Sequence, residues 1–242
     1  MKKNVALVDI RIPECASDIL TDYGYIIIRV PRAGYLAPPV ASHPDMVFFA
    51  LGEQLFCHSR YLETPEGDNT ANTIAALTDL IITPISDETG DKYPLDVRLN
   101  CAVVGNILMA SPYTSVAVTE AADELGMTVI KVKQGYVKCS SAVIDGVKRG
   151  IITSDTKIAS AAKKEGIETL TVPHGEIVLE GYSYGFIGGC TGFDDGRMFF
   201  TGDLAEYPYG KEVKAFLDSL SCEAVSLLPD VPFTDYGSIL FI

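Results

Sequence analysis

The chain has 242 residues, of which 48% are hydrophobic and 21% are charged, and its formal net charge at pH 7 is −13. That charge argues against a nucleic-acid partner, because binding to a phosphate backbone requires a concentrated lysine and arginine surface. No apolar run approaches the roughly 20 residues that a membrane-spanning helix requires. Asp9 and Arg11 also interrupt the first apolar segment too early for a secretory signal. We therefore expect a cytoplasmic protein without nucleic-acid or membrane partners, and the acidic balance is compatible with a cationic small molecule as ligand.

Six cysteines are spread along the chain, tens of residues apart. They are Cys15, Cys57, Cys101, Cys139, Cys190 and Cys222. Neither Cys-x-x-Cys spacing nor a small disulfide framework is present, so we expect free thiols in a reducing compartment. Apart from His43 and Asp45, no residues of the metal-binding types show the close spacing of ligands on one element. The sequence predicts neither a metal site nor another cofactor.

One unit recurs along the chain: an apolar strand, a tight turn, a second apolar strand, a helix and a third strand. The chain begins partway through such a unit, with a strand at 4–9, a helix at 15–20 and a strand at 25–29. Four complete copies follow, each a hairpin, a helix and a strand: 43–56, 71–80 and 80–83; 101–110, 116–125 and 127–132; 141–153, 157–165 and 168–172; 191–201, 212–220 and 224–228. Self-similarity at such a period predicts a repeat architecture.

The two ends of the chain complete a fifth unit. Segment 236–242 is a lone apolar strand, and the N-terminal piece lacks the first strand of its unit. If the two ends pair, no sheet edge is exposed at the join, which removes an aggregation hazard. We therefore expect an α/β fold of five pseudo-symmetric units, a propeller closed by pairing of the N- and C-terminal strands. The composition is compatible with a single domain over residues 1–242.

In such a ring the first strand of each unit lies nearest the axis, so the residues that precede these strands meet at one end of the central channel. Aligning the apolar runs places several polar residues and cysteines at or next to this point. They are His43, Asp45, Asn100, Cys139, Cys190 and Asp235. This composition is unusual for a core and indicates a candidate functional site.

The chemistry of three of these residues fits nucleophilic catalysis. Cys139 can supply a thiolate, His43 a proton donor or acceptor, and Asp45 a carboxylate that orients the imidazole or holds a cation. Lys138 gives the thiolate no help if both residues lie on a strand, since neighbours there point to opposite faces. Taken singly, a buried cysteine is more commonly a small core residue, so a structural role for Cys139 stays open. The candidate substrate-binding residues are Asn100, Cys190 and Asp235, with Cys190 also the next candidate nucleophile.

The pattern of units and two strand starts resemble the pentein superfamily, the α/β propeller shared by guanidine-modifying enzymes and by the ribosome-binding translation initiation factor six. His43-Pro-Asp45-Met-Val-Phe48 resembles the His-x-Asp-x-x-Phe strand start of arginine and agmatine deiminases. Val137-Lys-Cys139-Ser-Ser-Ala-Val143 resembles the Cys-x-Ser/Thr strand start that carries their nucleophile. Their nucleophile lies in the split unit, so the resemblance implies a divergent member whose termini are permuted around the ring.

The resemblance implies two alternative functions. The first is a cysteine-dependent hydrolase or amidinotransferase, in which Cys139 attacks the central carbon of an amidine or guanidine, His43 transfers the proton, and Asp45 and Asp235 hold the positive charge. The second is a non-catalytic pentein that binds a small ligand or a protein partner, as initiation factor six does. The Glu-Gly-Gly-Asp and Phe-x-Arg-Asp signatures of the enzymes are missing from the sequence, so it names no particular substrate.

Overall fold

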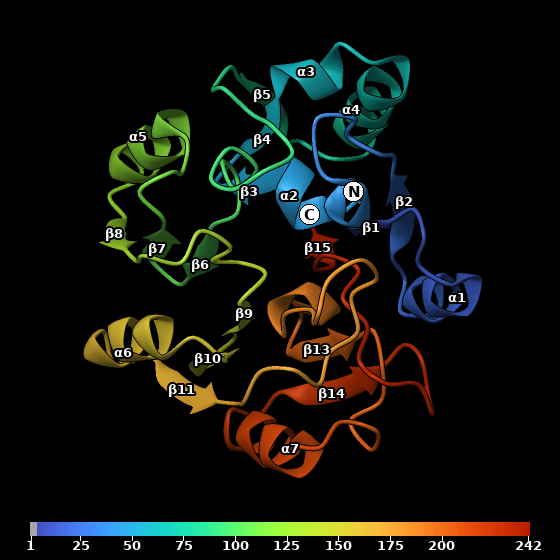
Figure 1. Ribbon diagram of the computed structural model, residues 1–242, viewed down its shortest axis with the longest axis vertical. Helices are drawn as coiled ribbons and strands as arrows, with labels where there is room; N and C mark the ends of the chain where they lie inside the picture. The colour runs from blue at the N-terminus through green and yellow to red at the C-terminus, as the bar shows by residue number, and fades with distance from the viewer. Residues whose placement is uncertain (1–3) are drawn as a thin grey trace.

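The computed structural model describes residues 4–242, and within them fifteen strands form five three-stranded sheets (Figure 1). From inner to outer strand the sheets are β15 (Leu240–Phe241), β1 (Val5–Asp9) and β2 (Ile26–Val30); β3 (Phe48–Leu51), β4 (Gln54–His58) and β5 (Ile81–Ile85); β6 (Ala102–Val104), β7 (Ile107–Ala110) and β8 (Thr128–Lys131); β9 (Ser141–Asp145), β10 (Arg149–Thr153) and β11 (Glu168–Thr171); β12 (Thr191–Asp194), β13 (Arg197–Phe200) and β14 (Glu223–Ser226).

Each sheet carries one longer helix between its middle and outer strands. These helices are α1 (Glu14–Asp22), α4 (Pro65–Leu77), α5 (Val116–Glu124), α6 (Thr156–Lys164) and α7 (Gly210–Ser219). The shorter helices are η1 (Pro38–Val40), α2 (Pro44–Val47), α3 (Ser59–Leu62) and η2 (Gly188–Cys190). Within residues 4–242, no helix combines the length and the apolar character that crossing a bilayer demands.

The unit built on β6, β7 and β8 illustrates how the local sequence directs the pairing. A tight turn in which Gly105 has a φ of +57° joins β6 to β7 antiparallel, with Ala102 opposite Met109. Strand β8 then pairs parallel to β7, which requires a crossover, and α5 provides it. Val118 of α5 and Leu108 of β7 are fully buried in the same apolar cluster. The apolar face of the helix therefore covers its own sheet.

The two ends of the described chain meet in one sheet, as the sequence predicts. Strand β15 pairs antiparallel with β1, with Leu240 opposite Leu7. The pairing continues beyond β15, because the Val5 and Ile242 backbones exchange hydrogen bonds of 3.0 and 2.9 Å. The first strand of this unit and its other two strands thus come from opposite ends of the sequence.

The inner strands lie toward the middle of the molecule and the longer helices toward its periphery. Figure 1 shows β3, β6, β9 and β15 around the centre, with α1, α4, α5, α6 and α7 outside them. Strand β9 is adjacent to both β6 and β12, and β12 is adjacent to β15. This arrangement gathers at the centre the segments that lead into the inner strands.

Two local expectations need correction. The sequence pattern extends the first strand of the second unit back towards residue 46, whereas the structure has one helical turn, α2, before β3. Pro44 occupies the first position of α2, where the fixed φ of proline suits the start of a helix. Helix α4 begins at residue 65 rather than 71, because Thr64 caps it by accepting a 3.1 Å hydrogen bond from Gly67 N–H. Both shifts follow from capping chemistry that apolar periodicity does not register.

Candidate functional site

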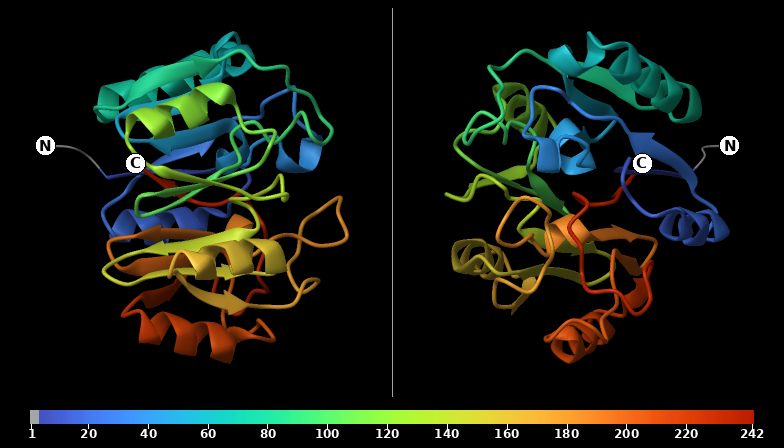
Figure 2. Two further views of the ribbon diagram at one scale, coloured as in Figure 1. Left: turned by 90° about the vertical axis from the view of Figure 1, so that its left-hand side faces the viewer. Right: turned by 45° about the vertical axis from the view of Figure 1, so that its right-hand side comes forward.

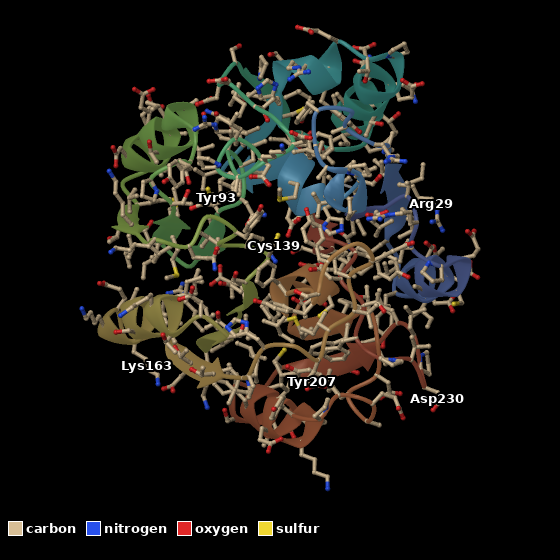
Figure 3. The ribbon with its side chains drawn as sticks, in the orientation of Figure 1. Arg29, Tyr93, Cys139, Lys163, Tyr207 and Asp230 are labelled. Atoms are coloured by element: carbon tan, nitrogen blue, oxygen red, sulfur yellow. The ribbon has the colours of Figure 1, made fainter. Side chains whose placement is uncertain are left out.

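The segments that precede the inner strands bring polar side chains together near the middle of the molecule. Asp45 lies on α2, Asn100 shortly before β6, Cys139 in the turn before β9, and Ser238 shortly before β15. Figure 3 labels Cys139 at the centre of this view, between the upper and lower sheets. Four different units thus contribute to one small region.

Asn100 connects three of these segments through a fully buried side chain. Its Oδ1 accepts hydrogen bonds from the backbone N–H groups of Lys138, at 2.9 Å, and Cys139, at 3.2 Å. Its Nδ2 donates to the backbone oxygen of Asp45 at 3.1 Å and to Cys139 Sγ at 3.0 Å. Asn100 therefore fixes the position of the thiol relative to α2.

The thiol of Cys139 is 4% exposed and donates a 3.2 Å hydrogen bond to Asp45 Oδ2. Burial, together with the nearby carboxylates of Asp45 and Asp235, raises the pKa of this thiol well above its usual value. The hydrogen bond from Asn100 acts in the opposite direction, because it favours the thiolate. In the ligand-free protein Cys139 is consequently a thiol at neutral pH.

The same oxygen of Asp45 also contacts Ser238, which in turn contacts Lys138. Ser238 Oγ lies 2.7 Å from Asp45 Oδ2 and 2.8 Å from the backbone oxygen of Gly188, so its single proton is shared between two acceptors. Lys138 Nζ donates to Ser238 Oγ at 2.9 Å. The other carboxylate oxygen of Asp45, Oδ1, is buried and has no hydrogen-bond partner in the described part of the chain. The site thus contains a continuous chain of hydrogen bonds from the amino group of Lys138, whose pKa burial lowers, to the thiol of Cys139.

The imidazole of His43 is 1% exposed and lies between two carboxylates. Its Nε2 is 3.9 Å from Asp9 Oδ2 and its Nδ1 is 3.8 Å from Asp235 Oδ1, both longer than a hydrogen bond. Neither ring nitrogen has a hydrogen-bond partner among residues 4–242, although both are buried. Arg11 fixes Asp9 through contacts of 2.9 and 2.6 Å from Nε and Nη2. Gly237, with a φ of +72°, lets the chain pass the ring where a Cβ would collide with it.

Asp235 is a buried acceptor that the backbone holds on both oxygens. Phe186 N–H donates to Oδ2 and Gly237 N–H to Oδ1, each at 2.9 Å. Burial raises the pKa of this carboxyl, an effect that His43 and the two backbone donors oppose. A Cβ at Gly189 would clash with its oxygens, so a glycine is needed for this approach.

Cys139, His43 and Asp235 line one cavity of about 210 Å³. Its remaining walls are mostly aromatic and aliphatic, formed by Tyr136, Tyr182, Tyr184, Phe186, Val40, Met46 and Leu179, with Ser183 as a further polar residue. A cavity with a few polar groups on a mostly apolar wall is typical of a small-molecule site. Lys138 and Asp45 line a second cavity of about 210 Å³, which runs along the inner strands.

The structure separates the six predicted residues into three placements. Cys139, His43 and Asp235 share the first cavity, whereas Asp45 and Asn100 lie behind the thiol and contact it directly. Cys190 lies outside both cavities, and its Sγ donates to the backbone oxygen of Ile187 at 3.2 Å. Among residues 4–242, no three side chains of the metal-binding types are arranged to hold a metal ion.

Sequence reasoning did not include Ser238, Lys138 or Asp9 in the site. The alternation rule that separates Lys138 from Cys139 applies to strands, whereas both residues lie in a turn. The side chains of Lys138 and Cys139 do not contact each other directly, but a chain of hydrogen bonds through Ser238 and Asp45 links them. The signal available for Ser238 was its place in the split unit, two residues before β15.

Solved structures with this architecture include several guanidine-modifying enzymes. Dimethylarginine dimethylaminohydrolase from Pseudomonas aeruginosa, complexed with citrulline, matches with a TM-score of 0.59 at 11% identity over 94% of this chain and 92% of its own. Agmatine deiminase from C. jejuni gives 0.54 at 8% identity, over 94% and 88% of the two chains. An amidinotransferase from Microseira wollei gives 0.55 at 11% identity, over 96% and 89%.

No curated protein is significantly similar to this chain in sequence. The sequence profile of a family of unknown function, DUF6873, matches residues 7–240, which is nearly the whole chain. The structural matches have low sequence identity and identify the fold, which is that of the pentein superfamily. The chain therefore belongs to the family of unknown function DUF6873 and has the pentein fold.

Proposed function

We propose that this protein is a cysteine-dependent hydrolase or amidinotransferase of amidine or guanidine compounds, with Cys139 as the nucleophile. One observation carries the proposal: the thiol of Cys139, the imidazole of His43 and the carboxylate of Asp235 line a single cavity. The fold shared with guanidine-modifying enzymes supports it. Because Asp235 is the carboxylate on the wall of the cavity, we expect the ligand to be a cationic small molecule.

The contacts suggest a route for each proton. The thiol proton passes to Asp45 Oδ2, to which it is already hydrogen-bonded, and Cys139 Sγ bonds to the central carbon of the cation. Protonated His43 gives its proton to the departing nitrogen, and the C–N bond breaks to release an amine. Water or an acceptor amine then bonds to the same carbon and loses a proton to His43. The C–S bond breaks, and Cys139 recovers its proton from Asp45.

The raised pKa of Cys139 fits a site that becomes reactive only when it is occupied. Two of the causes of that shift are the negative charges of Asp45 and Asp235. A bound cation lies within the same field and offsets both, which favours ionisation of the thiol. We therefore expect the substrate to increase the nucleophilicity of Cys139.

We also propose that the five sheets form a closed ring, with the two chain ends as its join. The antiparallel pairing of β1 with β15 supports closure, as does the adjacency of β6, β9, β12 and β15. A closed ring would surround the second cavity with inner strands and bring Ser238 to Asp45 from the far end of the chain.

A pair of alkylating reagents tests the proposed function. Chloroacetamidine is cationic, and chloroacetamide is its neutral counterpart of nearly the same shape. Mass spectrometry of the modified peptides would follow Cys139, with exposed Cys15 in the same molecule as the control for intrinsic reagent reactivity. We expect chloroacetamidine to modify Cys139 at least about tenfold faster than chloroacetamide, relative to Cys15, because the site selects a positive charge. If neither reagent modifies Cys139, Cys139 is not the nucleophile and the proposal fails; if Cys190 is also unmodified, the alternative of a non-catalytic binding protein would replace it.

A further inference from the structure

The cavity that contains Cys139 has a wall of aromatic rings next to the carboxylate. Tyr136 and Phe186 stack with centroids 6.0 Å apart, and Tyr184 meets Phe186 edge-on at 6.1 Å. The backbone N–H of Phe186 donates to Asp235 Oδ2, so this hydrogen bond holds the carboxyl group beside the residue that carries one of the rings. A cation next to Asp235 therefore also lies near aromatic rings, which attract positive charge through their electron-rich faces.

Much of this wall belongs to the segment between β11 and η2, which Figure 2 shows in orange, projecting beyond the sheets. The base of the segment is fixed: Val178 N–H donates to Phe233 O at 2.9 Å, Asp235 N–H to Val178 O at 2.8 Å, and Gly185 N–H to Ile177 O at 2.8 Å. These bonds hold the backbone of the segment in place beside the cavity. A preformed wall of this kind favours a ligand with a matching apolar tail.

None of the described residues that line the cavity is a lysine or an arginine. Arg11 comes near the wall, since its Nη2 donates to Pro39 O beside Val40, but its guanidinium is also bound to Asp9. A carboxylate on the ligand would find no lysine or arginine there and would face Asp235, while the imidazole of His43 already lies between the carboxylates of Asp9 and Asp235. Burying an unpaired charge is costly, so such a ligand is disfavoured.

We propose that the ligand of this cavity is an amidine or guanidine monocation with an apolar tail and no carboxylate. The identity of the cationic group rests on the proposed function, whereas the requirement for an apolar, uncharged tail comes from the walls of the cavity. Three probes with the same guanidine on a chain of four carbons separate the possibilities, and in arginine the fourth carbon also carries the carboxylate. Butylguanidine has an apolar tail, agmatine adds a terminal ammonium, and arginine carries both an ammonium and a carboxylate.

Equilibrium binding by calorimetry on the intact protein provides the test. We expect butylguanidine to bind at least about tenfold more tightly than arginine, with agmatine between them, because arginine must bury or leave unpaired its carboxylate. Equal or tighter binding of arginine would overturn the inference, and so would the absence of binding by all three probes. Tyr184→Ala should weaken butylguanidine binding by roughly two- to fivefold, since it removes one ring of the wall. Tyr23→Ala is the matched control, because Tyr23 is exposed to the same extent, 39% against 37%, and lies outside the cavity.

Turnover, measured as release of ammonia or amine, distinguishes the two proposals. If butylguanidine binds as expected but neither product forms, the proposed function fails and the ligand class stands. If arginine is converted with a kcat/KM equal to or above that of butylguanidine, the proposed function stands and the ligand class is wrong.

Discussion

Asn100→Ala should destabilise the protein strongly, because its side chain satisfies three backbone groups in two other segments. The substitution leaves the N–H groups of Lys138 and Cys139 and the carbonyl of Asp45 without their partner in a fully buried region. Each unsatisfied buried group costs about 1–3 kcal/mol, and with partial rehydration of the space we expect a total loss of about 3–6 kcal/mol. At about 2–4 °C per kcal/mol for a chain of this size, Tm should fall by about 6–24 °C.

Thermal unfolding followed by circular dichroism measures this loss, with Asn106→Ala as the matched control. Asn106 is an exposed asparagine whose Nδ2 donates a single 3.0 Å hydrogen bond to Gly126 O. Its removal should change the free energy of unfolding by no more than about 0.5 kcal/mol. If Asn100→Ala unfolds within about 2 °C of the unmodified protein, the assignment of Asn100 as the connector of these segments is refuted.

Four other perturbations follow from the structure. Burial raises the pKa of Cys139, so in the ligand-free protein a neutral alkylating reagent should modify Cys139 far more slowly than exposed Cys15 at pH 7. The rate at Cys139 should increase only in strong alkali. Rapid labelling of Cys139 at pH 7, measured by peptide mass spectrometry, would contradict this expectation. Burial also raises the pKa of Asp235, so the native state binds the carboxyl proton more tightly than the unfolded chain does. The contribution of this group to the free energy of unfolding should therefore fall as the pH rises above its unfolded pKa of about 3.9. Urea unfolding at a series of pH values measures this, and an Asp235→Asn variant with the same pH dependence of stability would count against it. Thr64→Ala should cost about 1 kcal/mol by removing the cap of α4, and an unaltered Tm would show that the cap is dispensable. Deleting residues 236–242 should cause aggregation detectable by light scattering, because it exposes an apolar strand edge; a monodisperse folded product would show that the edge is protected in another way.

The repeating unit made most of the fold predictable. Apolar runs separated by short turns placed every hairpin, and the unmatched strands at the two ends led to the pairing that Leu7 and Leu240 display. What periodicity could not supply was capping chemistry: Thr64 extends α4 backwards by six residues, and Pro44 starts a helical turn where a strand was expected. Caps depend on single side chains, whereas periodicity averages over many.

The site was less predictable than the fold, because its contacts cross between units. Register along the chain identified Cys139, His43 and Asp235, which share a cavity, but placed Cys190 beside them although its thiol faces backbone carbonyls. Register specifies which residues reach the centre and not which way their side chains turn. Ser238 was not predicted, because serine is common before a strand and its hydrogen bond to Asp45 is visible only in the structure.

The join between β1 and β15 has a consequence for biosynthesis. Leu7 leaves the ribosome more than two hundred residues before its partner Leu240, an interval of roughly 12 to 45 s at ordinary elongation rates. Throughout that time the nascent chain carries an apolar strand, fully buried in the finished protein, that lacks one neighbour. Asp235 and Ser238 arrive in the same final stretch, so the surroundings of the Cys139 thiol are assembled only when that strand docks. Before that strand docks, the new chain exposes an apolar strand edge to which chaperones can bind, and its candidate site is incomplete. Docking of the strand covers the edge and completes the site in one step.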